Sequence, residues 1–233
     1  MDKIQAVILA AGKGTRMLPL TANAPKPMQE VAGKNLLQWK IEALPEEVDE
    51  VILVIGYLGD VIRDFFGDEY QGKKIRYVVQ EELNGTGGAL WKAKELLRDR
   101  FIVMMGDDLY GRSDIANMLM YDFAIGGYPV HGRETGGEIT KNAAGHFDTI
   151  REERHFVEDG YVNTNLLMLR KELFEEELVQ IPGRTEYGLP HTILPLSEKI
   201  GVSLVVVQKW FQITEPGDLT RAEAFIQGDQ HLS

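Results

Sequence analysis

The sequence has no cysteine among its 233 residues. This absence excludes disulfide bonds, thiolate zinc sites and cysteine nucleophiles, so oxygen or imidazole ligands must hold any metal ion. The histidines show no metal-binding spacing. They are His131, His146, His155, His191 and His231.

Long apolar runs and an excess of positive charge are also absent. No run approaches the ~20 residues of a membrane span, and the N-terminus lacks a signal-peptide pattern, so we expect a cytosolic protein without membrane association. The net charge of −11 argues against nucleic-acid binding, which needs clustered lysine and arginine. An acidic protein that handles polyphosphate must therefore concentrate its few cations locally.

Strand-like and helix-like segments alternate in the first half of the chain. Strands are expected at residues 4–9, 51–55, 75–79 and 101–105, and helices at residues 36–44, 61–66 and 86–97. This order predicts an α/β fold of the Rossmann-like type, with a mostly parallel, mixed central sheet flanked by helices. Because ligands bind beyond the carboxyl ends of such strands, the segments after residues 9, 79 and 105 should meet at one site.

The second half is richer in strands. Strands are expected at residues 123–130, 138–150, 161–169, 202–207 and 210–213, and helices at residues 187–198 and 216–226. There is no repeat and no linker. We therefore expect a single domain, 1–233, with lobes at 1–122 and 123–233.

A glycine-rich loop follows the first expected strand. Residues 9–17 read Leu-Ala-Ala-Gly-Lys-Gly-Thr-Arg-Met. Small residues let backbone N–H groups approach phosphate oxygens, and Lys13, Arg16 and Lys26 bring cations to the same crevice. The loop is neither a P-loop nor a dinucleotide fingerprint, and on its own it is equally typical of a solvated connection.

The longer stretch from Leu9 to Leu37 resembles the signature of the sugar-1-phosphate nucleotidyltransferases. In that family the loop is followed by Thr-Arg, Pro-Leu-Thr, Pro-Lys-Pro and Gly-Lys-Pro-Leu-Leu. This chain has all four elements, with Asn35 in place of the last proline. The resemblance implies a fold of the nucleotide-diphospho-sugar transferase type, and an NTP and a sugar 1-phosphate as substrates.

Residues 80–89 resemble the base-reading loop of that family. The amide of Gln80 offers a donor and an acceptor, which suits the O4 and N3–H edge of uracil or thymine. UTP or dTTP is therefore expected, while GTP stays open because guanylyltransferases share the Gly-Thr-Gly element. On its own the segment is also typical of a polar turn before a helix.

Adjacent acids follow the strand at 101–105. The resemblance implies that Asp107 binds Mg²⁺ and that Asp108 contacts the sugar, although paired acids often only begin a turn. The family's second metal-binding aspartate is replaced by Gln212, a neutral amide. Either Asp107 holds the ion together with triphosphate and water, or the metal site is weakened. Asp218 is interpreted as part of a helix start.

The residues that would bind the acceptor, the sugar 1-phosphate, are inferred from weaker matches. The resemblance implies sugar-phosphate contacts from Gly137, Glu153, Arg154 and Thr164, with Arg154 in place of the family's lysine. Asn165 stands where the family has glycine. A solvated charged hairpin is the competing interpretation.

The resemblance also implies the remaining roles. Arg16 would hold the leaving pyrophosphate with help from Lys13, and Lys26 would bridge the two reacting phosphates. The nucleotide-binding residues would be Leu9, Ala10, Ala11, Gly12, Lys13, Gly14, Thr15, Gln80, Gly85, Thr86 and Gly106.

Two other functions compete with this assignment. A glycosyltransferase would need an Asp-x-Asp motif, which residues 107–109 lack, whereas a non-catalytic nucleotide-sugar sensor would fit the departures at Arg154, Asn165 and Gln212. The identity of the sugar and the oligomeric state, a homo-oligomer included, stay open.

Overall fold

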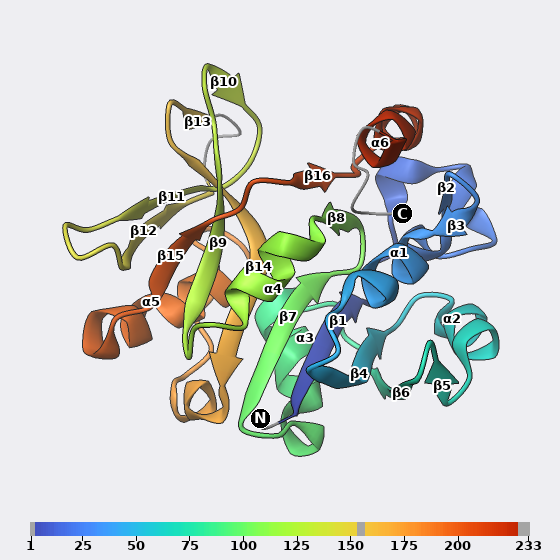
Figure 1. The fold of residues 1–233 in the computed structure, drawn as a ribbon, viewed down its shortest axis with the longest axis horizontal. Coiled ribbons are helices and arrows are strands. Elements are labelled where there is room, and N and C mark those ends of the chain that lie inside the picture. Colours follow the sequence, from blue (N-terminus) through green and yellow to red (C-terminus); the bar gives the residue numbers. More distant parts are fainter. Residues whose placement is uncertain (1–2, 153–156, 228–233) are drawn as a thin grey trace.

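A large mixed sheet organises the molecule (Figure 1). The computed structural model describes residues 3–152 and 157–227. Within them the sheet has ten strands, and its main path runs β12-β11-β14-β7-β1-β4-β6-β5. Four adjacent parallel strands form its centre: β7 (Arg100–Met105), β1 (Ile4–Ala10), β4 (Val48–Ile55) and β6 (Lys73–Val79). The predicted α/β class and parallel centre are confirmed.

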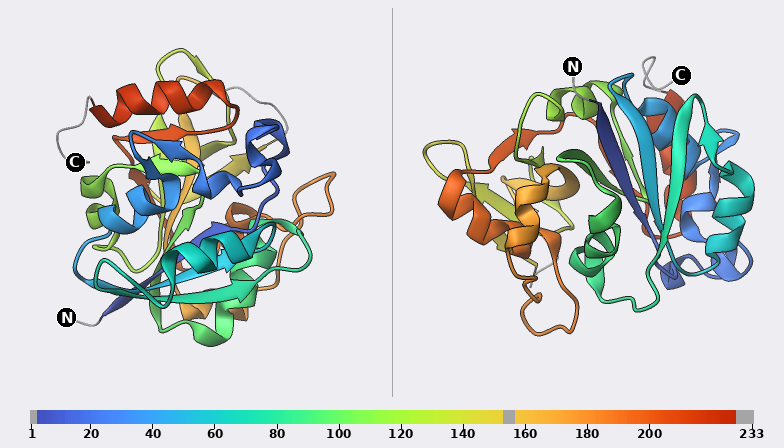
Figure 2. Two further views of the ribbon diagram at one scale, coloured as in Figure 1. Left: turned by 90° about the vertical axis from the view of Figure 1, so that its right-hand side faces the viewer. Right: turned by 90° about the horizontal axis from the view of Figure 1, so that it is seen from below.

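Helices cover both faces of this sheet (Figures 1 and 2). Side chains alternate along β1, so Ala6 and Ile8 pack into one core cluster while Val7 and Leu9 pack into another. The first cluster includes residues of α1 (Leu36–Ala43), α2 (Gly59–Phe66) and α4 (Arg112–Met118). The second includes residues of α3 (Gly85–Ala93) and α5 (Leu189–Ile200). Burial on both faces explains why β1, β4 and β7 are mostly apolar.

The second half of the chain continues the same sheet. Strand β14 (Tyr161–Arg170) pairs antiparallel with β7 and with β9 (Ala124–Pro129), and β9 pairs parallel with β15 (Ser203–Val206). The expected strand at 138–150 is instead a hairpin of β11 (Glu138–Lys141) and β12 (Phe147–Arg151). Its turn is fixed by Asn142, whose side-chain oxygen accepts hydrogen bonds from the N–H groups of Ala144 and His146.

Short elements close the carboxyl end of the sheet. Strand β8 (Asp108–Tyr110), which the sequence analysis did not predict, pairs with β16 (Trp210–Gln212). Helix α6 (Gly217–Gln227) lies against the N-terminal loop, near β2 (Glu30–Val31) and β3 (Lys34–Asn35) (Figure 1). A third core cluster joins these parts. The remaining short strands are β5 (Glu69–Tyr70), β10 (Arg133–Glu134) and β13 (Val157–Glu158).

The departure at Asn35 has a local explanation. Asn35 is the N-cap of α1, where its side chain accepts a hydrogen bond from the N–H of Gln38 at 2.9 Å. The Gln38 side chain accepts one from the N–H of Asn35 in return. This capping box satisfies two backbone donors at the start of the helix.

Among the described helices none is long and apolar enough to cross a membrane.

Candidate active site

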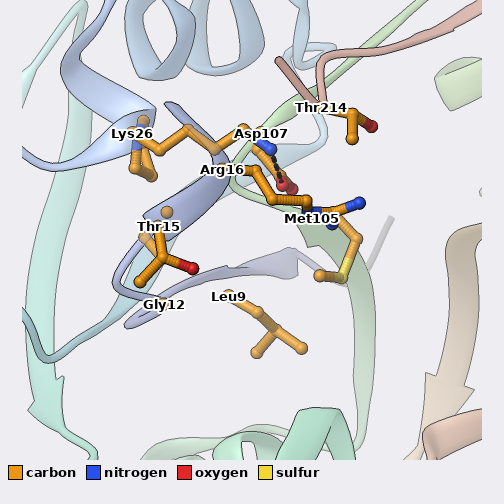
Figure 3. A pocket seen from close by; sticks show the side chains of 11 residues that line it. Leu9, Gly12, Thr15, Arg16, Lys26, Met105, Asp107 and Thr214 are labelled. Carbon is orange, nitrogen blue, oxygen red and sulfur yellow. Dashed lines mark hydrogen bonds and ion pairs between the residues drawn. The ribbon is translucent and has the colours of Figure 1, made fainter. Parts of the chain in front are cut away.

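A cavity of about 220 Å³ lies at the carboxyl ends of β1 and β7 (Figure 3). Its walls come from the loop after β1, the residues after β7 and the segment after β16. The lining residues are Leu9, Ala10, Gly12, Gly14, Thr15, Arg16, Lys26, Pro27, Met105, Asp107 and Thr214. The segments that follow Leu9 and Met105 therefore meet, as the parallel-sheet argument predicts. Met105, Pro27 and Thr214 were not among the predicted site residues.

A buried ion pair forms one wall of the cavity. Lys26 Nζ lies 2.6 Å from Asp107 Oδ2, and the dashed line in Figure 3 marks this contact. Lys26 is only 6% exposed, whereas the Asp107 side chain keeps 28% of its surface open. A buried ammonium group is costly unless it is paired, so this contact ties the two loops together.

Glycines allow these loops to approach each other. Gly14 has φ +60°, and a Cβ there would lie 2.9 Å from Lys26 Cβ. A Cβ on Gly106 would lie 2.8 Å from the carbonyl oxygen of Leu9, and the N–H of Gly106 donates a hydrogen bond to that oxygen. Both positions therefore exclude a side chain. Gly106 holds β1 and β7 together behind the cavity and does not line it.

Two further cations stand beside the ion pair. Arg16 and Lys13 are exposed, and neither forms an ion pair with another described residue. Arg16 lines the first cavity, while Lys13 lines a second cavity of about 400 Å³. This part of the surface can therefore attract a polyanion, despite the net negative charge of the chain.

The second cavity has an apolar wall and a polar edge. Val79 and Leu83 are 43% and 41% exposed there, next to Gln80. The Nε2 of Gln80 donates hydrogen bonds to Asn84 Oδ1 at 3.0 Å and to the carbonyl oxygen of Gly85 at 3.2 Å. Such a surface suits a flat ring with a polar edge. Its lining is completed by Lys13, Gly56, Tyr57 and Glu81.

Besides Gly106, three predicted nucleotide-binding residues line neither the first nor the second cavity. A Cβ on Gly85 would overlap the backbone of Tyr187, and the Thr86 hydroxyl accepts a hydrogen bond from the N–H of Leu189. Both residues join α3 to the start of α5. Ala11 is buried, and its carbonyl oxygen accepts a hydrogen bond from the N–H of Tyr57.

The side chains of Asp108 and Thr164, which were expected to contact the sugar phosphate, are buried. Asp108 is 1% exposed and its Oδ2 accepts a hydrogen bond from Trp210 Nε1 at 3.0 Å. Burial, with the nearby charge of Asp107, raises the pKa of Asp108 to about 7. Thr164 is fully buried, and its hydroxyl donates to the carbonyl oxygen of Gly126 at 2.9 Å. Because both side chains face the interior, neither is open to a sugar.

Of the other residues predicted to bind the sugar phosphate, the structure describes Gly137, which does not line the first cavity. Gly137 precedes β11, and its carbonyl oxygen accepts a hydrogen bond from the N–H of Asn163, while Glu153 and Arg154 lie outside the described residues.

Asn165, which stands where the family has glycine, adopts φ +51° within β14. Asparagine tolerates this left-handed conformation better than most residues, and mutual hydrogen bonds with Asn163 support it.

Gln212 and Asp107 line different cavities. Gln212 is exposed on β16 opposite Asp108, beside a third cavity of about 560 Å³. Thr214 lines both this cavity and the first one. The other lining residues are Tyr128, Glu134, Thr135, Trp210, Phe211, Glu215, Asp218 and Arg221. The described part of the chain contains no group of three or more histidine, aspartate or glutamate side chains placed to hold a metal ion.

Asp218 stabilises the start of α6, as its sequence position predicts. It lies in the first turn of α6, where its Oδ2 accepts hydrogen bonds from the N–H groups of Thr214 and Glu215. These contacts explain why the pKa of Asp218 lies below its ordinary value despite partial burial. Its carboxylate is therefore engaged at the helix start.

The sequence analysis also missed a buried lysine behind the site. Lys40 is 1% exposed, and its Nζ donates to the carbonyl oxygen of Leu36 at 3.2 Å. Burial lowers the pKa of Lys40 from 10.5 to about 7, although the charges of Asp107 and Asp108 oppose the shift. The helical spacing of Lys40 from Leu36 and Leu37 was a signal that it faces the core.

The low pKa of Lys40 makes its effect on stability pH-dependent. Between about pH 7 and 10 the folded protein carries less charge at Lys40 than the unfolded chain, so the burial penalty is full below pH 7 and fades as pH rises. We expect Lys40→Met to melt roughly 5 °C above the wild type at pH 6, with a smaller difference at pH 9. The exposed Lys171→Met is the control. Calorimetric melting that shows a pH-independent difference for Lys40→Met would contradict this expectation.

Comparisons with known proteins agree with the geometry. Residues 5–125 match the family model described as nucleotidyl transferase. The bifunctional protein GlmU of Methanocaldococcus jannaschii is 31% identical over 225 residues, which cover 96% of this chain and 54% of that protein. The UTP–glucose-1-phosphate uridylyltransferase AglF of Haloferax volcanii is 29% identical over 235 residues, covering 96% and 97% of the two chains.

A solved structure is also similar. The crystal structure of HddC from Yersinia pseudotuberculosis complexed with GMP-PN has a TM-score of 0.70 at 25% identity, covering 95% of this chain and 98% of that one. The chain spans about half the length, or less, of the GlmU proteins that it matches.

Proposed function

The chain belongs to the nucleotidyl transferase family, and from this premise we propose that it transfers a nucleoside monophosphate from an NTP to a sugar 1-phosphate. The observation that carries the proposal is the first cavity, where Arg16 and the Lys26–Asp107 pair face one space at the strand ends. This set of charges suits phosphate oxygens and a divalent cation. Residues 1–122 would bind the nucleotide, and residues 123–233 the acceptor.

The proposed reaction is a direct displacement. An oxygen of the sugar 1-phosphate attacks the α-phosphorus of the NTP in line, the bond to the bridging oxygen of the β-phosphate breaks, and pyrophosphate leaves. The protein contributes position and charge neutralisation. Lys26 would draw the α-phosphate and the acceptor phosphate together, while Arg16, assisted by Lys13, would hold the pyrophosphate.

Asp107 fits the binding of a Mg²⁺ ion together with the substrate. Lys26 contacts only Oδ2 of Asp107, and the side chain remains partly open to the cavity. Mg²⁺ keeps several waters and is commonly held by one or two carboxylates plus substrate phosphates, so one aspartate suffices. When bound, the ion would neutralise charge on the reacting phosphates. Gln212 would reach this Mg²⁺ ion only from the third cavity, which shares the lining residue Thr214 with the first cavity.

The base is proposed to be uracil or thymine, in view of Gln80 beside the second cavity. AglF is described as using UTP, whereas HddC was crystallised with a guanine nucleotide. GTP is therefore the alternative within the family. A non-catalytic nucleotide-sugar sensor is the alternative outside catalysis.

A substrate panel tests the function and the base together. We expect pyrophosphate release with UTP or dTTP and at least one sugar 1-phosphate, at rates well above those with ATP or GTP. A tenfold or larger preference for GTP would replace the proposed base with guanine. Nucleotide-sugar binding without pyrophosphate release from any pair would identify a sensor.

The cations of the first cavity should control turnover. Lys26→Ala and Arg16→Ala are each expected to lower kcat by at least ~100-fold, because each removes a positive charge from the transition state. The exposed Lys171→Ala is the control, and circular dichroism should be unaltered in Arg16→Ala. Rates near those of the wild type in both variants would refute the assigned roles.

The metal prediction separates Asp107, Gln212 and Asp218. We expect Asp107→Ala to abolish activity and Gln212→Asp to tighten Mg²⁺ binding, since a carboxylate adds a full charge beside the ion. Asp218→Ala should lose stability rather than metal affinity, because its carboxylate accepts backbone hydrogen bonds. Mg²⁺ titrations of activity check all three. Inactive Asp218→Ala together with unchanged affinity in Gln212→Asp would show that the metal site lies elsewhere.

A further inference from the structure

The orientation of the Gln80 amide is fixed before any nucleotide binds. Gln80 is 5% exposed, and its Nε2 lies within hydrogen-bond distance of Asn84 Oδ1 and of the Gly85 carbonyl oxygen. A backbone carbonyl can only accept, so the atom that faces Gly85 must be the amide nitrogen. Both amide hydrogens are then used, and Oε1 is the remaining polar atom of the side chain.

Asn84 is held in place for this contact by the glycine one turn later. A Cβ on Gly88 would overlap the side-chain amide of Asn84. Gly88 lies inside α3, where glycine costs about 1 kcal/mol relative to alanine. The Asn84 side chain makes no capping hydrogen bond to α3, although Asn84 is the N-cap residue. The described contacts of the Asn84 side-chain oxygen therefore serve Gln80 and not the helix.

We propose that Asn84, seated on Gly88, is a positioning residue that makes Gln80 a hydrogen-bond acceptor only, and so selects bases with a ring N–H. The proposal rests on the nucleotide-binding role given above to the second cavity. Uracil, thymine and guanine carry a hydrogen on the ring nitrogen of their pairing edge, whereas cytosine and adenine carry a lone pair there. An oxygen held against that position accepts from the first group and repels the second.

Release of the amide should remove this selection. Without Asn84 Oδ1, one hydrogen of Gln80 Nε2 loses its acceptor, and a shift of the side chain can offer this N–H group to cytosine or adenine while the other hydrogen still faces the Gly85 carbonyl oxygen. One neutral hydrogen bond gained or lost changes affinity by up to about tenfold. UTP and CTP are the sharpest pair of probes, because their bases differ only at the N3 and C4 positions.

Three variants separate this role from helix stability. Asn84→Leu removes the acceptor at similar size, and Gly88→Ala keeps Asn84 but occupies the space of its side chain. Because alanine favours a helix more than glycine does, Gly88→Ala should not weaken α3 through helix propensity. Asn84→Asp is the matched control, since its carboxylate still accepts from Gln80 Nε2.

The experiment is calorimetric binding of UTP and CTP to the full chain, with inorganic pyrophosphate as the reference for the first cavity. We expect the wild type and Asn84→Asp to bind UTP about tenfold more tightly than CTP. In Asn84→Leu and Gly88→Ala the ratio should fall toward one, while pyrophosphate affinity stays unchanged. An unchanged ratio in both variants, or no preference for UTP in the wild type, would overturn the proposal. Selective binding without turnover would overturn the transferase function and leave this inference standing.

Discussion

The buried ion pair between Lys26 and Asp107 is the contact on which the site depends. Its partners lie 81 residues apart and meet at 2.6 Å because β1 and β7 are neighbouring parallel strands whose carboxyl ends face the same edge. Gly14 and Gly106 remove the side chains that would keep the two loops apart. A lysine ammonium group with 6% exposure is costly to leave unpaired, so the pair holds the loops together as it neutralises the charge.

Charge is distributed unevenly around this pair. The chain carries a net charge of −11, yet Lys13 and Arg16 stand exposed at one edge and are not paired with other described residues. Lys40 is buried, and the charges of Asp107 and Asp108 act on its pKa, while the charge of Asp107 helps to raise the pKa of Asp108. The charge of a bound divalent cation or polyphosphate would therefore act on buried ionisable groups as well as on those at the surface.

The three cavities at the carboxyl edge of the sheet differ in the chemistry of their lining side chains. An apolar wall with an amide edge lies beyond β6, cations and one carboxylate lie beyond β1 and β7, and aromatic, acidic and amide side chains lie around β16. Thr214 lines both the first and the third cavity. A nucleotide would occupy the first two in the proposed function, because a base prefers a flat apolar wall and a triphosphate prefers cations.

Local periodicity and the rule that parallel strands end together were enough to predict the order of the main strands, the glycine-rich loop, and the sheet edge where the segments that carry Lys26 and Asp107 meet. The sequence did not show which of the two neighbours, Asp107 or Asp108, has an exposed side chain. Asp108 lies in the core because the pairing of β8 with β16, two segments distant in sequence, turns its side chain toward Trp210. Thr164 is buried for the same reason, because its side-chain direction depends on contacts between segments distant in sequence, whereas the helical spacing of Lys40 from Leu36 and Leu37 already indicated that Lys40 faces the core.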